Sequence, residues 1–491
     1  MGPSDLPNIF ILTADSLRAD AFSETMEEVT SLMSGVEFTD AVSTASATDS
    51  SMPALAAGVY GDTVQTATGT LRLGESRKKD GFVTMAERLS EVGYQCSLWS
   101  RNPIFGAVRN YDRGFVAGKA GTPTFQKRAQ AVVQQFGSDR LFSVCRWLYF
   151  NVFTPIKSII TEETYFGTAH KLHESTLNSL GDNRTGGQMH WLHYMDTHHP
   201  FDPPTEYLER RTFNSDWNRG KLSELSSRTM IASGRAETTD KDIADIREAY
   251  LACCEYLRDE LAVFIRELQD RGHFVPGRDI MVFTADHGEG FSLDKHGILG
   301  HTPTPSFWED LIKVPLVVSH PEWTPETIDY QVSLIDIMPT VLAAIDVDVP
   351  ESVEGRAARQ PDDLHREHTY FTSIGPKRIH RGIRAESGWK LFSDRINTTG
   401  GSESNSDRED DYERVLLTTF NGEETVQFES EIEDGSRPSE GVARETYTKL
   451  SAMLDRHRGG LVTEKEREGI TNEMEQQLRD LGYIDDVPSE R

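Results

Sequence analysis

The sequence predicts an α/β fold with a doubly wound, mostly parallel sheet flanked by helices, followed by a small C-terminal α+β subdomain. Two observations carry this prediction. Short apolar runs bounded by Pro, Gly, Asp or Asn alternate with stretches of helical periodicity, as in repeated βα units. After about residue 370 the pattern changes to closely spaced, hairpin-like runs. We therefore divide the chain into a main domain over residues 1–370 and an antiparallel subdomain over 371–491.

Buried parallel strands account for the apolar runs of the main domain, because each run is short and ends at turn-forming residues. The expected strands cover residues 9–14, 95–99, 191–195, 280–285 and 314–319. The clearest helix begins near Thr239, an N-cap followed by acidic residues, and continues to about Gly272 with one apolar stripe. It leads directly into the strand expected at 280–285.

Two further regions complete the expected architecture. Residues 117–185 form a mostly helical insertion that could cover a site at the sheet edge. In the subdomain, hairpins are expected over 379–392 and over 415–428, where Asn421-Gly422 is a typical turn. The polar stretch 397–411 between them predicts a mobile loop. Residues 471–484 predict a short amphipathic C-terminal helix.

The charge balance excludes nucleic acid as the main partner. The 491 residues include 79 acidic and 51 basic side chains, which gives a net charge of −28 and a sequence pI of about 4.9. Phosphate backbones require basic surfaces. Acidity spread over the whole chain is typical of proteins from a high-salt cytoplasm, such as that of haloarchaea, because salt screens the self-repulsion.

Cysteine usage and the terminal sequence predict a cytoplasmic protein. The N-terminus has neither a basic segment nor a cleavage site, so its apolar run indicates a first strand. The longest apolar stretch, 141–160, contains charges and a proline, which argues against a membrane span. The four cysteines have no ligand-like spacing and indicate a reducing compartment: Cys96, Cys145, Cys253 and Cys254.

Polar residues follow three of the expected strands at the points where chemistry occurs in α/β sheets. Aspartate and histidine together suit Zn, Mn or a related divalent ion. A helix cap is the alternative interpretation of one aspartate after a strand, whereas three such ends favour a metal-dependent site. The residues are Asp15, then Asp196 with His198 and His199, then Asp286 with His287.

Five motifs, taken in their order along the chain, make it resemble the sulfatase-like branch of the alkaline phosphatase superfamily over about residues 7–395. They are PNIFILTADSLRAD, HYMDTHHPFDPP, TADHGEGFSLDKHGILGH with FWEDLIKVPLVV, VSLIDIMPTVLAAI and, beyond that range, LRDLGYI. The resemblance implies an alkaline phosphatase-like fold and a divalent metal ion, with Ca, Mg, Mn and Zn all open. It also implies a small anionic ester as substrate, including glycan- or lipid-linked esters.

The departures from that family concern the nucleophile. Many sulfatases carry two consecutive aspartates where this chain has Asp15 and Ser16, and type I sulfatases carry Cys-x-Pro-x-Arg where it has ASATDSSMPALAAGVYG. The family's ten-residue spacing, counted back from Gly58, falls on Thr48. A competing register places Ser51 first, because it precedes Met-Pro and leaves Leu55 at the arginine position. Helix capping by Thr48 is compatible with a catalytic role.

The resemblance implies a role for each candidate residue. The metal ligands are Asp15, Thr48, Asp286 and His287. Thr48 is also the catalytic nucleophile, His198 protonates the leaving oxygen, and His301 stands where many sulfatases carry a lysine that contacts the anion. His296, Ser51 and Asp196 are the expected substrate-binding residues. A two-metal site that uses Asp196 with His198, His296 or His301 stays open.

These assignments predict a metal-dependent hydrolase or transferase that acts on phosphate or sulfate esters through a covalent threonine intermediate. A sulfatase in the strict sense is the first alternative, and it would use Ser51 or an unmodified hydroxyl. A non-catalytic anion-binding member of the fold is the second. The threonine at position 48 favours phosphoryl transfer over formylglycine chemistry.

Overall fold

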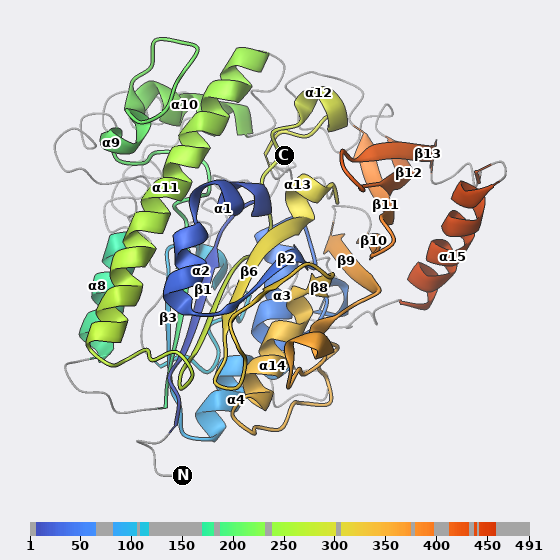
Figure 1. The fold of residues 1–491 in the computed structure, drawn as a ribbon. Helices are drawn as coiled ribbons and strands as arrows, with labels where there is room; N and C mark the ends of the chain where they lie inside the picture. Colours follow the sequence, from blue (N-terminus) through green and yellow to red (C-terminus); the bar gives the residue numbers. More distant parts are fainter. Residues whose placement is uncertain are drawn as a thin grey trace, which may run out of the picture.

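The computed structural model describes residues 6–64, 82–105, 109–116, 169–180, 187–230, 238–300, 306–374, 379–396, 412–431, 437–438 and 441–457. These residues form a large sheet between two layers of helices and a separate small antiparallel sheet (Figure 1). The structure thereby confirms the fold class expected from the sequence. The predictions made for residues 117–168, for the loop 397–411, for the C-terminal helix 471–484 and for Cys145 lie outside the described residues.

The large sheet has eight strands in the order β3-β4-β1-β5-β6-β2-β7, with β8 paired to β2. Its first four strands are parallel, whereas β6 is antiparallel to both β5 and β2. The central strand β1 lies between β4 and β5, so the carboxyl ends of these three strands share one edge. The strands are β1 Ile9–Ala14, β2 Val36–Val42, β3 Gln95–Ser100, β4 Gln188–Tyr194, β5 Ile280–Ala285, β6 Lys313–Ser319, β7 Thr327–Ile328 and β8 Val332–Ser333.

Each of the five strands expected from the sequence is present, and β1 and β5 have the expected bounds. Both are fully buried, which explains why their apolar runs were so clear. Strand β2 was not expected. Its sequence VEFTDAV carries polar residues, and its register with β6 shifts between Phe38 and Ala41, so part of the strand is exposed to solvent. An irregular strand that mixes polar with apolar residues leaves no continuous apolar signal.

Two helical layers cover the sheet (Figure 1). One layer gathers around the long helix α11, and the other consists of α3, α4 and α14, which contact one another. The first layer contains α1 Ala19–Thr25, α2 Glu27–Met33, α8 Ala169–Leu180, α9 Thr205–Leu208, α10 Arg219–Met230 and α11 Asp240–Asp270. The second contains α3 Thr48–Ala57, α4 Met85–Glu91 and α14 Ile337–Ala343. Short helices α12 Leu293–His296 and α13 Glu309–Ile312 follow β5.

Helix α11 begins where the sequence predicts. Thr239 is its N-cap, and the Thr239 hydroxyl accepts a hydrogen bond from the amide of Asp242 while the Asp242 carboxylate accepts one from the amide of Thr239. This capping box satisfies two amides at the helix start. The apolar stripe of α11 is buried against the rest of its layer, so this helix fixes the position of the chain that enters β5.

Helix α8 is the described part of the expected insertion, and it is attached to the end of β4. The amide of Ala169 donates to Oδ1 of Asp196, at 3.2 Å. His173 on the same helix lies 3.0 Å from the Tyr194 hydroxyl through Nε2 and stacks on Phe264 of α11. These contacts join the insertion to the edge of the sheet at which β4 ends.

The small sheet is an antiparallel meander in the order β13-β12-β11-β10-β9. Its strands are β9 His368–Ile374, β10 Ile379–Ala385, β11 Trp389–Ile396, β12 Tyr412–Thr419 and β13 Thr425–Glu431. The two hairpins expected from the sequence are β10-β11 and β12-β13. Helix α15, Val442–Arg456, contacts β10 and β11 on the outer side of this sheet (Figure 1).

An apolar cluster and a buried group of charges join the two sheets. Trp308 and Leu311 from the α13 region pack against Phe371 and Phe392 of the small sheet. Beside them Lys390, which is 0% exposed, lies 2.9 Å from Oε1 of Glu309. Burial acts to raise the pKa of Glu309, but Lys390 and Arg384 outweigh it and lower this pKa to about 2. The carboxylate is therefore held charged inside the joint.

Arg384 and Lys390 each bridge two acidic partners in this joint. The Arg384 guanidinium donates to both oxygens of Asp40 at 2.8 Å and to Oε2 of Glu309 at 3.1 Å. Lys390 also contacts Oε1 of Glu424 at 2.7 Å. Because Asp40 belongs to β2 and Arg384 to β10, the charges fix the small sheet relative to the large one.

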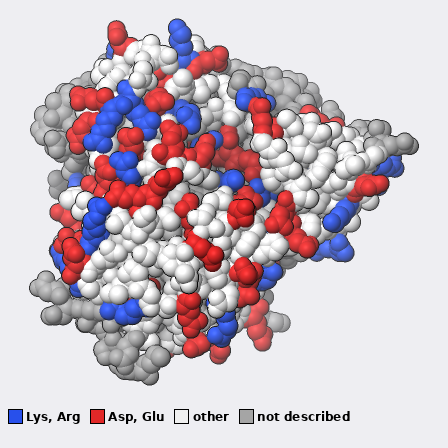
Figure 2. Space-filling view, viewed as in Figure 1, with Lys and Arg blue, Asp and Glu red and all other residues white. Residues whose placement is uncertain are grey.

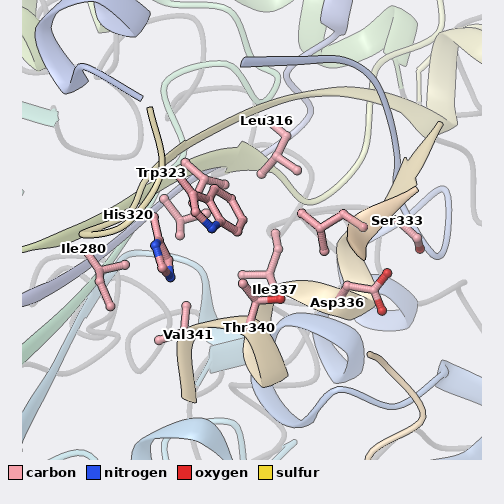
Figure 3. A pocket seen from close by; sticks show the side chains of 12 residues that line it. Ile280, Leu316, His320, Trp323, Ser333, Asp336, Ile337, Thr340 and Val341 are labelled. Carbon is pink, nitrogen blue, oxygen red and sulfur yellow. The ribbon is translucent and has the colours of Figure 1, made fainter. Parts of the chain in front are cut away.

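A small cavity lies between β5, β6 and α14, with a volume of about 10 Å³ (Figure 3). Apolar side chains such as Ile280 and Leu316 line it, together with Trp323, His320 and Asp336. That volume accommodates about one water molecule. Among the described residues that line the cavity, none is a site residue predicted from the sequence. Within the same described part of the chain, no helix combines the length and the apolar character that crossing a bilayer requires.

Replacement of the buried lysine of the joint should destabilise the fold strongly. Lys390→Ala removes the lysine beside the buried carboxylate of Glu424 and leaves Glu309 with Arg384, so we expect a loss of about 3–5 kcal/mol in the free energy of unfolding. Lys313→Ala is the matched control, because Lys313 pairs with Asp40 at 3.3 Å but is 37% exposed. A loss below about 1 kcal/mol is expected there. Denaturant unfolding at fixed salt measures both, and equal losses would contradict the argument.

The carboxyl group of Asp196 should make stability depend on pH. Burial raises the pKa of Asp196 to about 7, the hydrogen bond from Ala169 opposes this, and Glu260 adds to it. The folded protein therefore keeps a proton that the unfolded chain releases above about pH 4. Stability attributable to this group falls as pH rises from about 4 to about 7.

Asp196→Asn retains an acceptor for the amide of Ala169 but carries no charge, so it should flatten that dependence. Above pH 7 we expect the variant to be more stable than the parent by up to about 4 kcal/mol, at about 1.4 kcal/mol per pKa unit. Denaturant unfolding between pH 4.5 and 8 measures the difference. Asp346→Asn, at a side chain that is 86% exposed, should leave the profile unchanged. Parallel profiles for the parent and the Asp196 variant would refute the prediction.

Candidate active site

Three strand ends bring the candidate residues together at one edge of the large sheet. Asp15 directly follows β1, and its amide donates to the carbonyl of Tyr194 at the end of β4, at 2.9 Å. Asp286 directly follows β5, the other neighbour of β1. Both carboxylates are 0% exposed. The strand order of the sheet therefore places two acidic side chains, 271 residues apart in sequence, in the same buried space.

His193 completes a compact group of potential ligands. Donor atoms of Asp15, Asp286 and His193 all lie within 4.8 Å of one another. His193 Nε2 is 3.2 Å from Oδ2 of Asp15, and its Nδ1 is 2.9 Å from the hydroxyl of Thr13. Thr13 faces His193 in the register of β1 and β4. This contact fixes the imidazole ring so that its other nitrogen faces the carboxylates.

His287 presents its Nε2 atom to the same group. Its Nδ1 donates to the carbonyl of Gly288 at 2.7 Å, so Nε2 carries the lone pair of the neutral ring. Nε2 lies 3.7 Å from Oδ1 of Asp15 and 3.6 Å from Oδ2 of Asp286. A backbone partner on one ring nitrogen is the usual arrangement of a histidine that binds metal through the other.

Gly288 makes this turn possible. A Cβ atom at this position would lie 2.1 Å from the carbonyl oxygen of Asp310. The Gly288 amide donates to the carbonyl of Leu311 at 2.8 Å, which ties the turn to α13. Any side chain would push His287 away from Asp15, so the Asp-His-Gly sequence is required by packing as well as by chemistry.

Thr48, the first residue of α3, faces the carboxylate and imidazole groups. Its Oγ1 lies 3.2 Å from Nε2 of His287 and 3.4 Å from Oδ2 of Asp15. Ser51 lies one turn later in the same helix, and its hydroxyl donates to the carbonyl of Thr48 at 3.3 Å. The structure thus directs the hydroxyl of Thr48 toward the site and that of Ser51 toward the helix backbone.

Ser16 donates a hydrogen bond to each of the two aspartates, although the sequence did not mark it as a site residue. Its hydroxyl donates to Oδ1 of Asp15 at 3.1 Å, and its amide donates to Oδ1 of Asp286 at 3.2 Å. Its φ angle is 62°, a left-handed conformation that serine rarely adopts. In place of a second carboxylate, Ser16 therefore supplies two hydrogen-bond donors to the acidic pair.

Asn102 reaches the site from the loop that follows β3. Its Nδ2 donates to Oδ2 of Asp15 at 3.0 Å, and its Oδ1 accepts from the amide of Ile104 at 3.0 Å. The backbone contact identifies which end of the amide side chain faces the carboxylate. Asp15 is therefore contacted from the ends of β3, β4 and β5 together.

His198 lies in the loop after β4 and is 0% exposed. Its Nδ1 donates to the carbonyl of His199 at 2.5 Å, and the two imidazole rings stack with their centroids 4.3 Å apart. The neighbouring Thr197 donates its hydroxyl to the carbonyl of Asp15 at 2.6 Å. This contact holds the loop of His198 against the end of β1.

The other predicted site residues have different surroundings. Asp196 accepts from Ala169 at the start of α8. His296 stacks on Trp308, with ring centroids 3.9 Å apart, and its Nε2 lies 3.4 Å from the carbonyl of Glu424 in the small sheet. The contacts of Asp196 and His296 thus lie with α8 and with the joint between the sheets, whereas Asp15, Thr48, Asp286 and His287 contact one another. His301 lies outside the described residues.

Two aspartates buried side by side shift each other's ionisation. Burial acts to raise the pKa of Asp15, but His198, His193 and His287 outweigh it and hold this pKa well below its usual range. Burial and the nearby charge of Asp15 raise the pKa of Asp286 to about 7. A divalent cation would relieve the repulsion between two such carboxylates.

The donor set fits such a cation. Two carboxylates and the neutral Nε2 of His287 form a mixture that suits Zn, Mn or a related ion, and the hydroxyl of Thr48 adjoins them. His193 was not among the ligands expected from the sequence, and neither Asn102 nor Ser16 was proposed as a site residue. One signal could have found His193, namely a histidine near the carboxyl end of an otherwise apolar strand. Asn102 likewise follows a strand end, as Asp15 does.

Comparison with known proteins identifies the family of the fold. The sulfatase family model matches residues 7–347. An uncharacterized sulfatase, YidJ, of Escherichia coli strain K12 is 25% identical over 176 residues, which are 34% of each protein. The chain thus spans about a third of the length of this relative.

Solved structures agree at the level of the fold. The phosphonate monoester hydrolase SpPMH from Silicibacter pomeroyi superposes with a TM-score of 0.63 and 16% identity, over 93% of this chain and 96% of that one. The 2-O GAG sulfatase BT1596 superposes with a TM-score of 0.58 and 14% identity, over 92% of each chain. Because the family model covers residues 7–347 of the 491, this chain belongs to the sulfatase family.

Proposed function

We propose that this protein is a metal-dependent hydrolase or transferase of phosphate or sulfate esters that forms a covalent intermediate on Thr48. One observation carries the proposal. The Thr48 hydroxyl lies 3.2 Å from Nε2 of His287 and 3.4 Å from Oδ2 of Asp15, inside the group that includes Asp286. A nucleophilic hydroxyl requires activation, and the neighbourhood of metal ligands is where such activation occurs.

The proposed ligands are Asp15, Thr48, Asp286 and His287, with His193 beside them. A divalent cation bound there would polarise an ester oxygen and lower the pKa of the Thr48 hydroxyl. Ca, Mg, Mn and Zn ions all accept carboxylate oxygen, and the imidazole nitrogen favours Mn or Zn over Ca and Mg. Ser16 and Asn102 orient the carboxylates through the hydrogen bonds that they donate to them.

The proposed reaction uses two residues of this chain directly. The Thr48 hydroxyl loses its proton to solvent, Oγ1 attacks phosphorus or sulfur in line with the leaving ester oxygen, and the bond to that oxygen breaks. His198 donates a proton to the leaving oxygen, since its Nδ1 is committed to the carbonyl of His199 and Nε2 is the other proton-bearing position. Water or an acceptor alcohol then attacks the covalent intermediate and regenerates Thr48.

A phosphate or phosphonate ester is the substrate class that we favour. The nucleophile segment contains no cysteine, and Ser51 donates its hydroxyl to the carbonyl of Thr48, which favours Thr48 over a modified Ser51. Family membership keeps sulfate esters as the second candidate. Small anionic esters, including glycan- or lipid-linked ones, are the expected partners, and His301 and His296 stay proposed contacts of the anion.

A high-salt cytoplasm is the proposed setting. Acidic side chains are spread over the face seen in Figure 2, between the basic ones, and the net charge is −28. Repulsion among so many charges is tolerable where salt screens it over a few ångströms. The buried cysteines Cys96, Cys253 and Cys254 are free thiols, in keeping with a reducing compartment. We therefore propose that activity be assayed at high salt.

Loss of the Thr48 hydroxyl should abolish turnover. We expect Thr48→Ala to lower kcat for a nitrophenyl phosphodiester by at least about 10³-fold, because no covalent intermediate can form. Ser51→Ala is the matched control in the same helix and should keep kcat within about threefold, since its hydroxyl contacts only the backbone among its recorded partners. Nitrophenolate release is assayed at high salt with Mn, Zn, Mg or Ca, alongside the corresponding sulfate ester.

Two outcomes would contradict that prediction. Equal activity in the two variants would remove Thr48 as the nucleophile. Retained activity in Thr48→Ala together with inactive Ser51→Ala would support the competing register, and a mass shift on the peptide that contains Ser51 would then identify a modified serine. Trapping a phosphorylated or sulfated peptide by mass spectrometry after acid quenching identifies the residue directly.

Removal of one ligand charge should release the metal. We expect Asp286→Asn to lower the affinity for Mn²⁺ or Zn²⁺ by about 10–100-fold or more, because an anionic oxygen becomes a neutral amide. Elemental analysis after dialysis, together with calorimetric titration of the metal alone, gives the occupancy and the affinity. Asp196→Asn, at the neighbouring strand end, should retain the metal. Full occupancy in the Asp286 variant would disprove the ligand assignment.

A further inference from the structure

The position of Thr48 depends on how the start of α3 is held. Thr48 is the first residue of this helix, and the N-cap Ala47 has no side chain that could bind the first amides. The end of a helix without such a cap frays readily. A displacement of about 1 Å at a reacting atom can cost about 100-fold in rate. The first turn therefore requires another restraint if Thr48 is to face Asp15 and His287.

Arg109 supplies that restraint through Asp49, the residue after Thr48. Its Nε donates to Oδ1 of Asp49 at 2.8 Å, and its Nη2 donates to Oδ2 at 2.8 Å. Two parallel bonds between a guanidinium and a carboxylate fix the angle as well as the distance. The side chains are 6% and 20% exposed, so solvent competes little for either group.

A second contact ties the same turn of the helix to the sheet. The Tyr111 hydroxyl donates to the carbonyl of Asp49 at 3.1 Å. Tyr111 packs against Phe105, whose ring lies 4.5 Å from that of His193. The segment 109–111 thus connects the start of α3 to the imidazole that faces Asp15. This connection passes through packed side chains whose exposed fractions are 1% for both Tyr111 and Phe105.

The pair also accounts for a departure noted in the sequence. The type I sulfatases that this chain resembles carry an arginine in the nucleophile segment, and this chain has no arginine in ASATDSSMPALAAGVYG. Here the guanidinium comes from outside the helix and binds Asp49 in its first turn. Burial acts to lower the pKa of Arg109, but the Asp49 charge outweighs it and raises that pKa, so the guanidinium stays charged.

We infer that the ion pair between Arg109 and Asp49 is a positioning device that directs the Thr48 hydroxyl into the site. Neither residue touches the reacting atoms in this arrangement, because the carboxylate of Asp49 occupies two donors of the guanidinium. The inference rests on the proposed function, since it assigns a purpose to the orientation of the nucleophile. It predicts an effect on kcat at saturating metal without an effect on the binding of substrate.

A double-mutant cycle tests the inference on the full chain. We expect Asp49→Asn and Arg109→Gln each to lower kcat for the nitrophenyl ester by about 10–100-fold at saturating Mn²⁺, with KM within about twofold of the parent. The double variant should be no slower than the slower single variant, because both changes remove one interaction. If one single variant does not fold, the double variant, which leaves no unpaired charge, carries the test.

Arg366→Gln is the matched control. Arg366 also binds a carboxylate through two bonds, to Oδ2 and Oδ1 of Asp336 at 2.6 Å each, and its partner lines the cavity of Figure 3, whose described lining includes no proposed site residue. Its loss should lower stability by an amount similar to that of Arg109→Gln and leave kcat unchanged. A merely structural role of the Arg109 pair would give the same result in both variants.

Three results would overturn the inference. A parent-like kcat in Asp49→Asn and Arg109→Gln would leave the pair a structural feature only. A higher KM with unchanged kcat would make Arg109 a ligand of the substrate anion, and additive losses in the double variant would separate the two residues. Thr48→Ala, measured in parallel, distinguishes the failures, because activity in that variant refutes the proposed function whatever the cycle shows.

Discussion

The burial of two like charges beside each other, on Asp15 and Asp286, is the constraint on which the rest of this structure depends. Two unit charges about 4 Å apart repel by about 4 kcal/mol at the effective dielectric constant of a protein. The strand order places both carboxylates at one edge, and the amide of Ser16, the side chain of Asn102 and two imidazoles then surround them. A site of this kind is costly to an apo protein and is stabilised by whatever cation it binds.

The fold was more predictable from the sequence than the site. Strands β1 and β5 are buried on both faces, so a continuous apolar run marked each of them, and Asp15 and Asp286 were conspicuous as the first polar residues after it. Strand β2 and His193 escaped notice for opposite reasons. Strand β2 mixes polar with apolar residues and has an exposed position, whereas His193 lies inside an apolar run and resembles a core residue. The periodicity of apolar residues indicates burial only. The structure of β2 and the role of His193 depend on neighbours that are distant in sequence.

Contacts between distant segments also set the surroundings of the two candidate hydroxyls. The sequence left Thr48 and Ser51 as competing registers, three residues apart on one helix. Residues three apart lie on the same face of a helix, so periodicity does not choose between them. The hydrogen bonds distinguish them, because the Thr48 hydroxyl faces Asp15 and His287 whereas the Ser51 hydroxyl donates to the carbonyl of Thr48. The guanidinium of Arg109 that holds the start of α3 comes from outside the nucleophile segment, and no local pattern in that segment reveals it.

The joint between the two sheets has a consequence for how this protein can diverge. Lys390 and Arg384 of the small sheet hold Glu309, which begins α13, and the carbonyl of Leu311 in α13 accepts from Gly288 beside His287. A mutation that reshapes the small sheet is therefore felt at the Asp-His-Gly turn two contacts away. We expect changes in the small sheet to disturb the Asp-His-Gly turn more than changes in segments that make no contact with α13. The ionic joint thus couples the small sheet to the candidate site, so that the two sheets must change together.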